Sequence, residues 1–161
     1  MARNAQRSRS RQAGFTLIEI LIVVAVIAVV AAIAVPNLLQ ARIRARASAI
    51  VADYHSVQQA ALSYYFDYNE FPPDTQPCQE PVELRRYIGA SLSWNPQGDH
   101  CYDWENWVRP DGTPMHPQTG IAIGFSVVTQ DQRLVEALRK ASLLELRRTV
   151  GNNYTFVIEG I

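Results

Sequence analysis

One long apolar segment near the amino terminus constrains this 161-residue chain more than any other feature. The 21 residues from Phe15 to Val35 include only two polar side chains, Thr16 and Glu19. As a helix this segment would be about 30 Å long, which matches the hydrocarbon core of a bilayer. A buried strand or helix of a soluble domain is the alternative, and the length of the run argues against it. We therefore predict a membrane-spanning helix in this segment.

The charges that flank the segment predict its orientation. Residues 1–14 carry four arginines and no acidic residue, so the positive-inside rule places them in the cytoplasm and sends the rest across. Three arginines beyond the helix, Arg42, Arg44 and Arg46, favour the opposite orientation. A cleaved secretory signal would have a shorter apolar core and a nearby small-x-small site. The motifs of that kind around Ala47 lie well beyond the run and among arginines.

Glu19 is the unusual residue of the apolar segment. A carboxylate at this position costs about 2.5–3.5 kcal/mol on insertion scales, so it is a candidate functional residue. The alternative is that Glu19 lies near the start of the helix and reaches the lipid headgroups.

The residues from Gly14 to Glu19 read G-F-T-L-I-E, after a short basic leader and before an apolar helix that contains Pro36. This string resembles the class III signal of type IV pilins and type II secretion pseudopilins. The resemblance implies cleavage between Gly14 and Phe15 by a prepilin peptidase, followed by N-methylation of the new Phe15 amine. The apolar helix would then be retained in the mature protein.

The same resemblance implies a location and a set of partners. The chain would cross the bacterial inner membrane once, with its amino terminus in the cytoplasm, and then enter a periplasmic or cell-surface filament. Its partners would be membrane lipid before assembly, the prepilin peptidase, an inner-membrane assembly platform and other copies of the chain.

Glu19 acquires a role under this interpretation. Cleavage exposes an α-amino group with a pKa near 8, and the Glu19 carboxylate of one subunit can neutralise the Phe15 amine of the next. A misaligned neighbour would leave that charge unpaired, so the pair would set the register of assembly. Pro36 lacks an N–H and crowds the preceding turn, which predicts a kink or local unwinding near residues 32–36.

We predict an α+β fold in which a long amino-terminal helix carries a head built on a small antiparallel sheet. The chain divides into a leader (1–14), a stem helix (15–36), an amphipathic spine helix (37–71) and a globular head (72–161). Apolar residues at alternating steps of four and three form one stripe along the spine: Ile43, Ala47, Ile50, Tyr54, Val57, Ala61, Tyr64 and Tyr68.

The head is regular only toward its end. Residues 80–88 suggest a short helix with Pro81 in its first turn, whereas the wider segment 72–120 shows no strong strand pattern. Beyond it, the pattern predicts strands over 121–128 and 154–159 and a helix over 130–148.

Two cysteines, Cys78 and Cys101, bracket the irregular part of the head. Because the predicted topology places the head outside the cytoplasm, we expect a disulfide, which should stabilise the fold by about 3 kcal/mol. A metal site that adds His100 and His116 is the alternative, although adjacent His100 and Cys101 do not have the usual zinc spacing.

Four acidic residues, Asp99, Asp103, Glu105 and Asp111, fall in what we interpret as one loop. Their oxygens suit Ca²⁺, and the resemblance adds that major pseudopilins carry a calcium-binding loop in the head. The spacing does not match an EF-hand, so a solvated acidic loop is favoured and calcium is a weak candidate. No cofactor is otherwise predicted, because the sequence lacks the common nucleotide, metalloprotease and nucleophile motifs.

These observations favour a structural filament subunit that is not an enzyme. The alternative is a minor pilin or competence pseudopilin whose head, at the filament tip, is adhesive or contacts DNA. Nucleic-acid binding is disfavoured because the chain has 15 basic and 15 acidic residues, and 11 against 15 without the leader. A membrane-anchored enzyme is a third hypothesis, for which no catalytic constellation is present.

Overall fold

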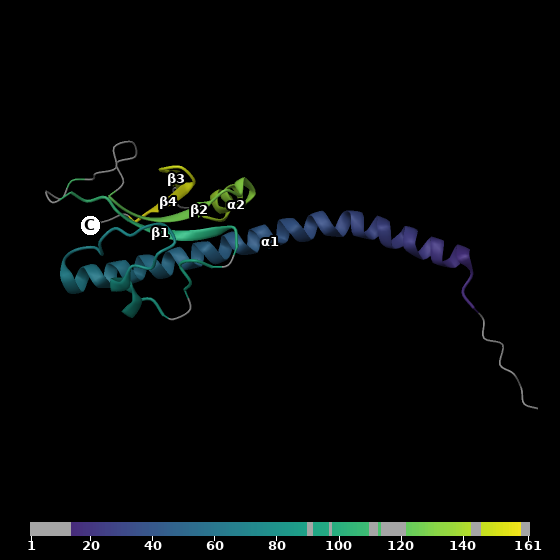
Figure 1. Ribbon diagram of the computed structural model, residues 1–161, viewed down its shortest axis with the longest axis horizontal. Helices are drawn as coiled ribbons and strands as arrows, with labels where there is room; N and C mark the ends of the chain where they lie inside the picture. Colours follow the sequence, from purple (N-terminus) through teal and green to yellow (C-terminus); the bar gives the residue numbers. More distant parts are fainter. Residues whose placement is uncertain are drawn as a thin grey trace, which may run out of the picture. The chain divides into compact units, whose positions relative to one another are not determined.

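The longest element of the chain, α1, is a 52-residue α-helix from Leu17 to Tyr68 (Figure 1). The structure, a computed structural model, describes residues 14–89, 92–96, 98–109, 113, 122–142 and 146–158. Its residue contacts form two units: a stem unit that ends at Leu39 and a head unit that begins at Gln40. α1 supplies the described helix of the stem unit and the first element of the head unit.

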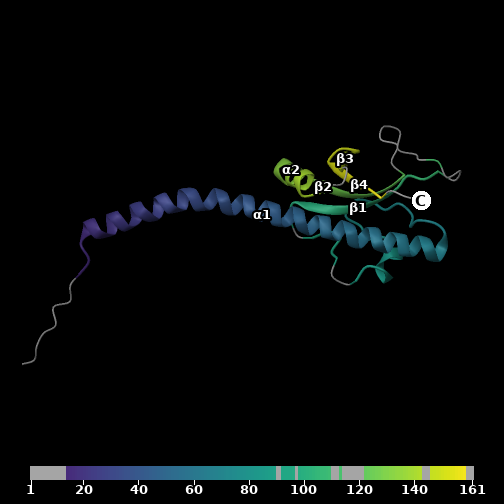
Figure 2. The ribbon, with the colours of Figure 1, turned by 180° about the vertical axis from the view of Figure 1, so that it is seen from behind.

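The other described elements all belong to the head unit, and they are four short strands and two short helices. In chain order they are the 3₁₀ helix η1 (Val82–Arg86), strands β1 (His100–Asn106) and β2 (Ile123–Thr129), helix α2 (Gln132–Ala141), and strands β3 (Leu146–Arg148) and β4 (Asn153–Val157). The sheet and α2 lie on the same side of the head part of α1 (Figures 1 and 2). The predicted α+β class, with a long helix and a small antiparallel sheet, is confirmed.

The predicted stripe of α1 forms one wall of the core. Six of its eight positions, from Ala47 to Tyr64, are buried, while Ile43 is partly exposed and Tyr68 is 50% exposed. Tyr54 lies at the centre of the stripe, with its ring 5.0 Å from that of Phe156 and its hydroxyl donating to the Val157 carbonyl. The helical period therefore identified the packed face.

The end of α1 is set by local backbone chemistry. Asn69 adopts a left-handed conformation (φ 56°) and donates its N–H to the Tyr65 carbonyl at 2.7 Å. Asparagine tolerates this conformation better than most residues, which is why it is common just after a helix. The two prolines that follow, Pro72 and Pro73, cannot resume the helix.

Pro36 does not interrupt α1. The helix is continuous on both sides of it, so the predicted unwinding near residues 32–36 is not present in the isolated chain. Proline removes the single hydrogen bond that its N–H would have made to Ala32, and the helical bonds on either side are enough to carry the helix through.

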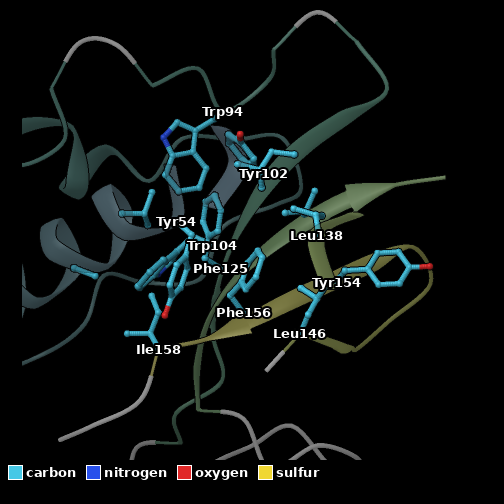
Figure 3. Packing of buried hydrophobic residues seen from close by; sticks show 14 of the residues in the cluster. Tyr54, Trp94, Tyr102, Trp104, Phe125, Leu138, Leu146, Tyr154, Phe156 and Ile158 are labelled. Carbon is cyan, nitrogen blue, oxygen red and sulfur yellow. The ribbon is translucent and has the colours of Figure 1, made fainter. Parts of the chain in front are cut away.

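The sheet has the order β1-β2-β4-β3, and all its pairs are antiparallel. The register aligns one apolar row across all four strands: Trp104, Phe125, Phe156 and Leu146. Figure 3 shows this row together with Tyr54 of α1 and Leu138 of α2 in the core cluster. The neighbouring row, on the opposite face because side chains alternate along a strand, is polar: Asp103, Ser126, Thr155 and Arg147.

Two predictions about the head are wrong. The segment 100–106, interpreted as part of an irregular acidic loop, is the strand β1. The helix predicted over 130–148 ends at Ala141, because Ser142 takes an extended conformation and residues 146–148 pair with β4 instead. Cross-strand pairing here outweighed helix propensity.

The predicted disulfide between Cys78 and Cys101 is present, with a Cα–Cα distance of 5.2 Å. It fastens the segment after α1 to the outer edge of β1, where the Cys78 N–H also donates to the Tyr102 carbonyl at 2.8 Å. Thr75 N–H donates to the Trp104 carbonyl in the same way. This segment therefore covers a sheet edge that would otherwise expose unpaired backbone groups.

Candidate assembly site

The first turn of α1 is closed by a reciprocal pair of hydrogen bonds between Thr16 and Glu19. The Thr16 backbone N–H and hydroxyl both donate to Glu19 Oε2 at 2.8 Å, and the Glu19 N–H donates to Thr16 Oγ1 at 3.3 Å. This arrangement is a capping box, which satisfies backbone donors that a helix start leaves unpaired. Glu19 thus stabilises its own helix, a role that the sequence interpretation did not assign.

The capping box could have been found from the sequence, because Thr-x-x-Glu before an apolar run is its signature. It does not displace the proposed pairing with a neighbouring amine. Among the described residues, both bonds that Glu19 accepts end on Oε2, so Oε1 keeps lone pairs for another donor. The capping box also holds the carboxylate at the end of the chain where the mature amino terminus would be.

The residues of the predicted cleavage site are accessible. Gly14 is exposed, with no atom within 4 Å of the position that a Cβ would occupy, and Phe15 is 84% exposed. Residues 1–13 of the leader lie outside the described part of the chain. A peptidase could reach the bond between Gly14 and Phe15 without unfolding the residues that follow.

The stem unit presents an apolar surface on every side. Its large aliphatic side chains between Leu17 and Leu39 are 49–93% exposed, and among the described residues this is the one helix long and apolar enough to cross a membrane. Continuous apolar surface of this size is rarely left to water. It requires either lipid or other apolar helices around it.

The three arginines that follow the stem have different surroundings. A single nitrogen of Arg46, Nη1, donates to both carboxylate oxygens of Asp99, at 2.8 Å to Oδ1 and 2.6 Å to Oδ2. Arg42 and Arg44 are exposed. Asp99 therefore partly neutralises the charge of Arg46, whose side chain is still 48% exposed. Arg42 and Arg44 lie nearer the stem on the surface of α1.

Asp103 and Glu105 form a buried acidic pair on the face of the sheet opposite the apolar row. They are 2% and 6% exposed, and the Asn153 side-chain amide donates to both at 3.1 Å. Burial, and then the neighbouring Glu105 and Asp74 charges, raise the pKa of Asp103 to about 8. Burial also raises the pKa of Glu105, although hydrogen bonds from Ser126 and Asn153 oppose the shift.

The four calcium candidates are not brought into one site by the described residues. Asp99 is paired with Arg46, and Asp111 lies outside the described residues. Asp103 and Glu105 do come together, but the described part of the chain has no group of three or more side chains suited to a metal.

Comparison with known protein families gives two matches along the chain. The model of the prokaryotic N-terminal methylation motif matches residues 9–35. The model named PilW, C-terminal, matches residues 43–110. The first match spans the leader, the capping box and most of the stem, and the second spans the head part of α1 through β1.

The similar proteins come from two kinds of assembly, type II secretion systems and a type IV pilus. Type II secretion system core protein G of Escherichia coli is 30% identical over 92 residues, which cover 57% of this chain and 63% of that protein. The protein of the same name from Pectobacterium carotovorum is 37% identical over 70 residues, covering 44% and 45%. Type IV wide pilus major component PilA4 of Thermus thermophilus is 45% identical over 58 residues, covering 36% and 44%. The chain thus spans less than two thirds of each of these relatives, and no solved structure matches it.

Proposed function

Since this chain belongs to the family of type IV pilins and type II secretion pseudopilins, we propose that it is processed and assembled as a structural subunit of such a filament. Prepilin peptidase would cleave after Gly14, and the new Phe15 amine would be methylated. The subunit would wait in the inner membrane and then leave it through an assembly platform. The relatives are named as a core protein of a secretion system and a major component of a pilus, which supports a structural role for this chain.

The exposed stem is the observation that carries this proposal. The head unit buries its own core against α1, α2 and the sheet within one chain. The described residues give the stem no such cover, and its large side chains are about half or more exposed. Lipid can cover it in the unassembled subunit, and the stems of other copies can cover it in a filament. Transfer between these two apolar environments costs little, because neither exposes the stem to water.

The Thr16–Glu19 pair supports a specific role in assembly. We propose that Glu19 neutralises the Phe15 amine of an adjacent subunit while Oε2 keeps its bonds to Thr16. A carboxylate that accepts such bonds is less costly to place among apolar helices. An incoming subunit in the wrong register would leave both the carboxylate and the amine unpaired, which is strongly unfavourable in an apolar environment.

The experiment must separate the charge of Glu19 from its capping function. Glu19→Gln keeps an acceptor for the Thr16 N–H but removes the charge, since glutamine serves equally in a capping box. Thr16→Val does the reverse: it removes the hydroxyl and keeps the carboxylate. We expect Glu19→Gln to insert into the membrane normally but to yield few filaments, and Thr16→Val to assemble close to wild type.

Membrane fractions and sheared filaments of the three chains, compared by immunoblot, would measure this. Filament yield from Glu19→Gln equal to wild type would show that the charge has no role in assembly. If Thr16→Val lost filaments and Glu19→Gln did not, Glu19 would act in assembly only by capping the helix. In the same sheared filaments, an abundant subunit is expected for a main structural component, and a trace amount would favour the tip-located minor pilin.

A further inference from the structure

A groove of about 750 Å³ lies in the head unit between the first turns of α1 that belong to it and helix α2. α1 contributes Ile43 and Arg44 to its lining, and α2 contributes Arg133, Glu136, Ala137 and Lys140, among others. The lining combines small or apolar side chains such as Ile43 and Ala137 with long charged ones such as Arg44 and Lys140. A groove of this volume is large enough to hold a small polar headgroup together with part of an apolar chain.

The groove is basic although the surrounding protein is acidic. Among the described residues, its lining carries three cations, Arg44, Arg133 and Lys140, against one carboxylate, Glu136. From Asp53 to the end of the chain there are 8 basic and 14 acidic residues. The groove therefore favours an anion at a place where most of the head would repel one.

The ion pairs already present at the groove are weak competitors for such an anion. Lys140 lies 3.1 Å from Glu136, and Arg133 lies 3.2 Å from Asp131. The Lys140 and Arg133 side chains are 74% and 75% exposed, and exposed pairs of this kind contribute little. Guanidinium groups bind phosphate through two parallel hydrogen bonds, so a phosphate can replace these contacts.

The position of the groove along the chain restricts which anion it meets. Gln40, which also lines the groove, directly follows the last residue of the stem unit, and the lining on α1 ends at Ser48. The lining on α1 therefore starts with the first residue beyond the stem. If the stem spans a membrane, as the proposed function requires, this start of the groove is next to the phospholipid headgroups.

We propose that this groove binds the headgroup of an anionic phospholipid in the leaflet from which the stem emerges. Arg44, Arg133 and Lys140 bind the phosphate, and Ile43 and Ala137 contact the apolar part of the lipid below it. The contact holds the head of the unassembled subunit against the membrane surface. It is released when the subunit leaves the bilayer, so it favours storage over assembly until an external force extracts the chain.

The test uses the full chain in nanodiscs that contain equal amounts of phosphatidylcholine and phosphatidylglycerol. Lipids that remain bound after detergent release are counted by native mass spectrometry. We expect wild type to retain phosphatidylglycerol in clear excess, and the excess to shrink at high salt. The preference for phosphatidylglycerol should fall about fivefold for each charge removed in the triple variant Arg44→Gln, Arg133→Gln, Lys140→Gln.

The matched control is Arg86→Gln, Arg139→Gln, Arg148→Gln, which removes the same charge from exposed positions that do not line the groove. It should retain the wild-type preference. Equal retention of both lipids by wild type, or equal loss in the two triple variants, would overturn the proposal. Unchanged lipid retention in the groove variant, with the groove protected from labelling only in filaments, would assign the groove to a second copy of the chain instead.

A carbonate wash of the cell membranes that contain the chain separates this proposal from the proposed function. A chain that stays in carbonate-washed membranes but shows no lipid preference overturns the lipid site alone. A chain that washes out of the membrane overturns both.

Discussion

The buried carboxylate of Asp103 should make the stability of the head fall as pH rises. Its pKa is about 8 in the folded chain and near 3.8 when unfolded, because the sheet buries it beside Glu105 and near Asp74. Between these two values the folded state binds a proton that the unfolded state releases. The free energy of unfolding therefore falls by about 1.4 kcal/mol for each pH unit in that window.

Asp103→Asn replaces the protonated carboxyl with a neutral group of the same shape. The new amide oxygen can still accept the bond from Asn153, which Asp103 Oδ2 accepts at 3.1 Å. Asp103 Oδ1 is buried and makes no hydrogen bond to a described residue, so the added NH₂ has no described acceptor there; this cost is the same at every pH and leaves the pH slope as the readout. From pH 5 to pH 7 wild type should lose about 3 kcal/mol more stability than the variant.

The assay is urea unfolding of the full chain in neutral detergent, followed by tryptophan fluorescence at several pH values. All three tryptophans lie in the head, so the signal reports on that unit. Glu70→Gln, which removes an exposed carboxylate, serves as the control and should keep the wild-type slope. Equal pH slopes in wild type and Asp103→Asn would refute the reasoning.

Three further changes test the packing of the head. Replacing Cys78 and Cys101 by serine removes a bridge across 23 positions and should cost about 3 kcal/mol in urea unfolding; an unchanged midpoint would show that the loop is held by other contacts. Leu138→Ala empties a fully buried position on α2 and should cost about 2–5 kcal/mol by the same assay, whereas a cost below about 1 kcal/mol would mean that α2 is not firmly docked. Tyr102→Phe removes a hydroxyl that donates to Asp53 Oδ2 at 2.6 Å and should cost about 1–3 kcal/mol; no loss of stability would contradict the tie between β1 and α1.

The elements that were predicted well are those whose signal is local and long. The stripe from Ala47 to Tyr64 repeats through several turns, so its period identifies both the helix and its buried face. The end of α1 is equally local, because it follows from Asn69 and the two prolines, whereas the Thr16–Glu19 box was not predicted although its spacing made it readable. Each of these depends on residues that are close together in the chain.

The strand β1 was missed for a physical reason. Tyr102 and Trp104 alternate with Asp103 and Glu105, which is a strand pattern, but acidic residues are usually solvated and the interpretation followed their charge. What makes these acids tolerable inside the sheet is the donation from Ser126 and Asn153, which are 21 and 48 positions from Glu105. Such partners are visible only once the strands are paired.

The sequence alone determined that this chain has an apolar stem, a charged start to that stem and one amphipathic helix beyond it. These follow from hydrophobic period and from the cost of placing charge in lipid, both of which act over neighbouring residues. Only the tertiary structure decided that residues 146–148 form a strand, that burial raises the pKa of Asp103, and that Arg44 shares a groove with Arg133 and Lys140. In each case the deciding free energy comes from contacts between distant segments, which a local pattern does not contain.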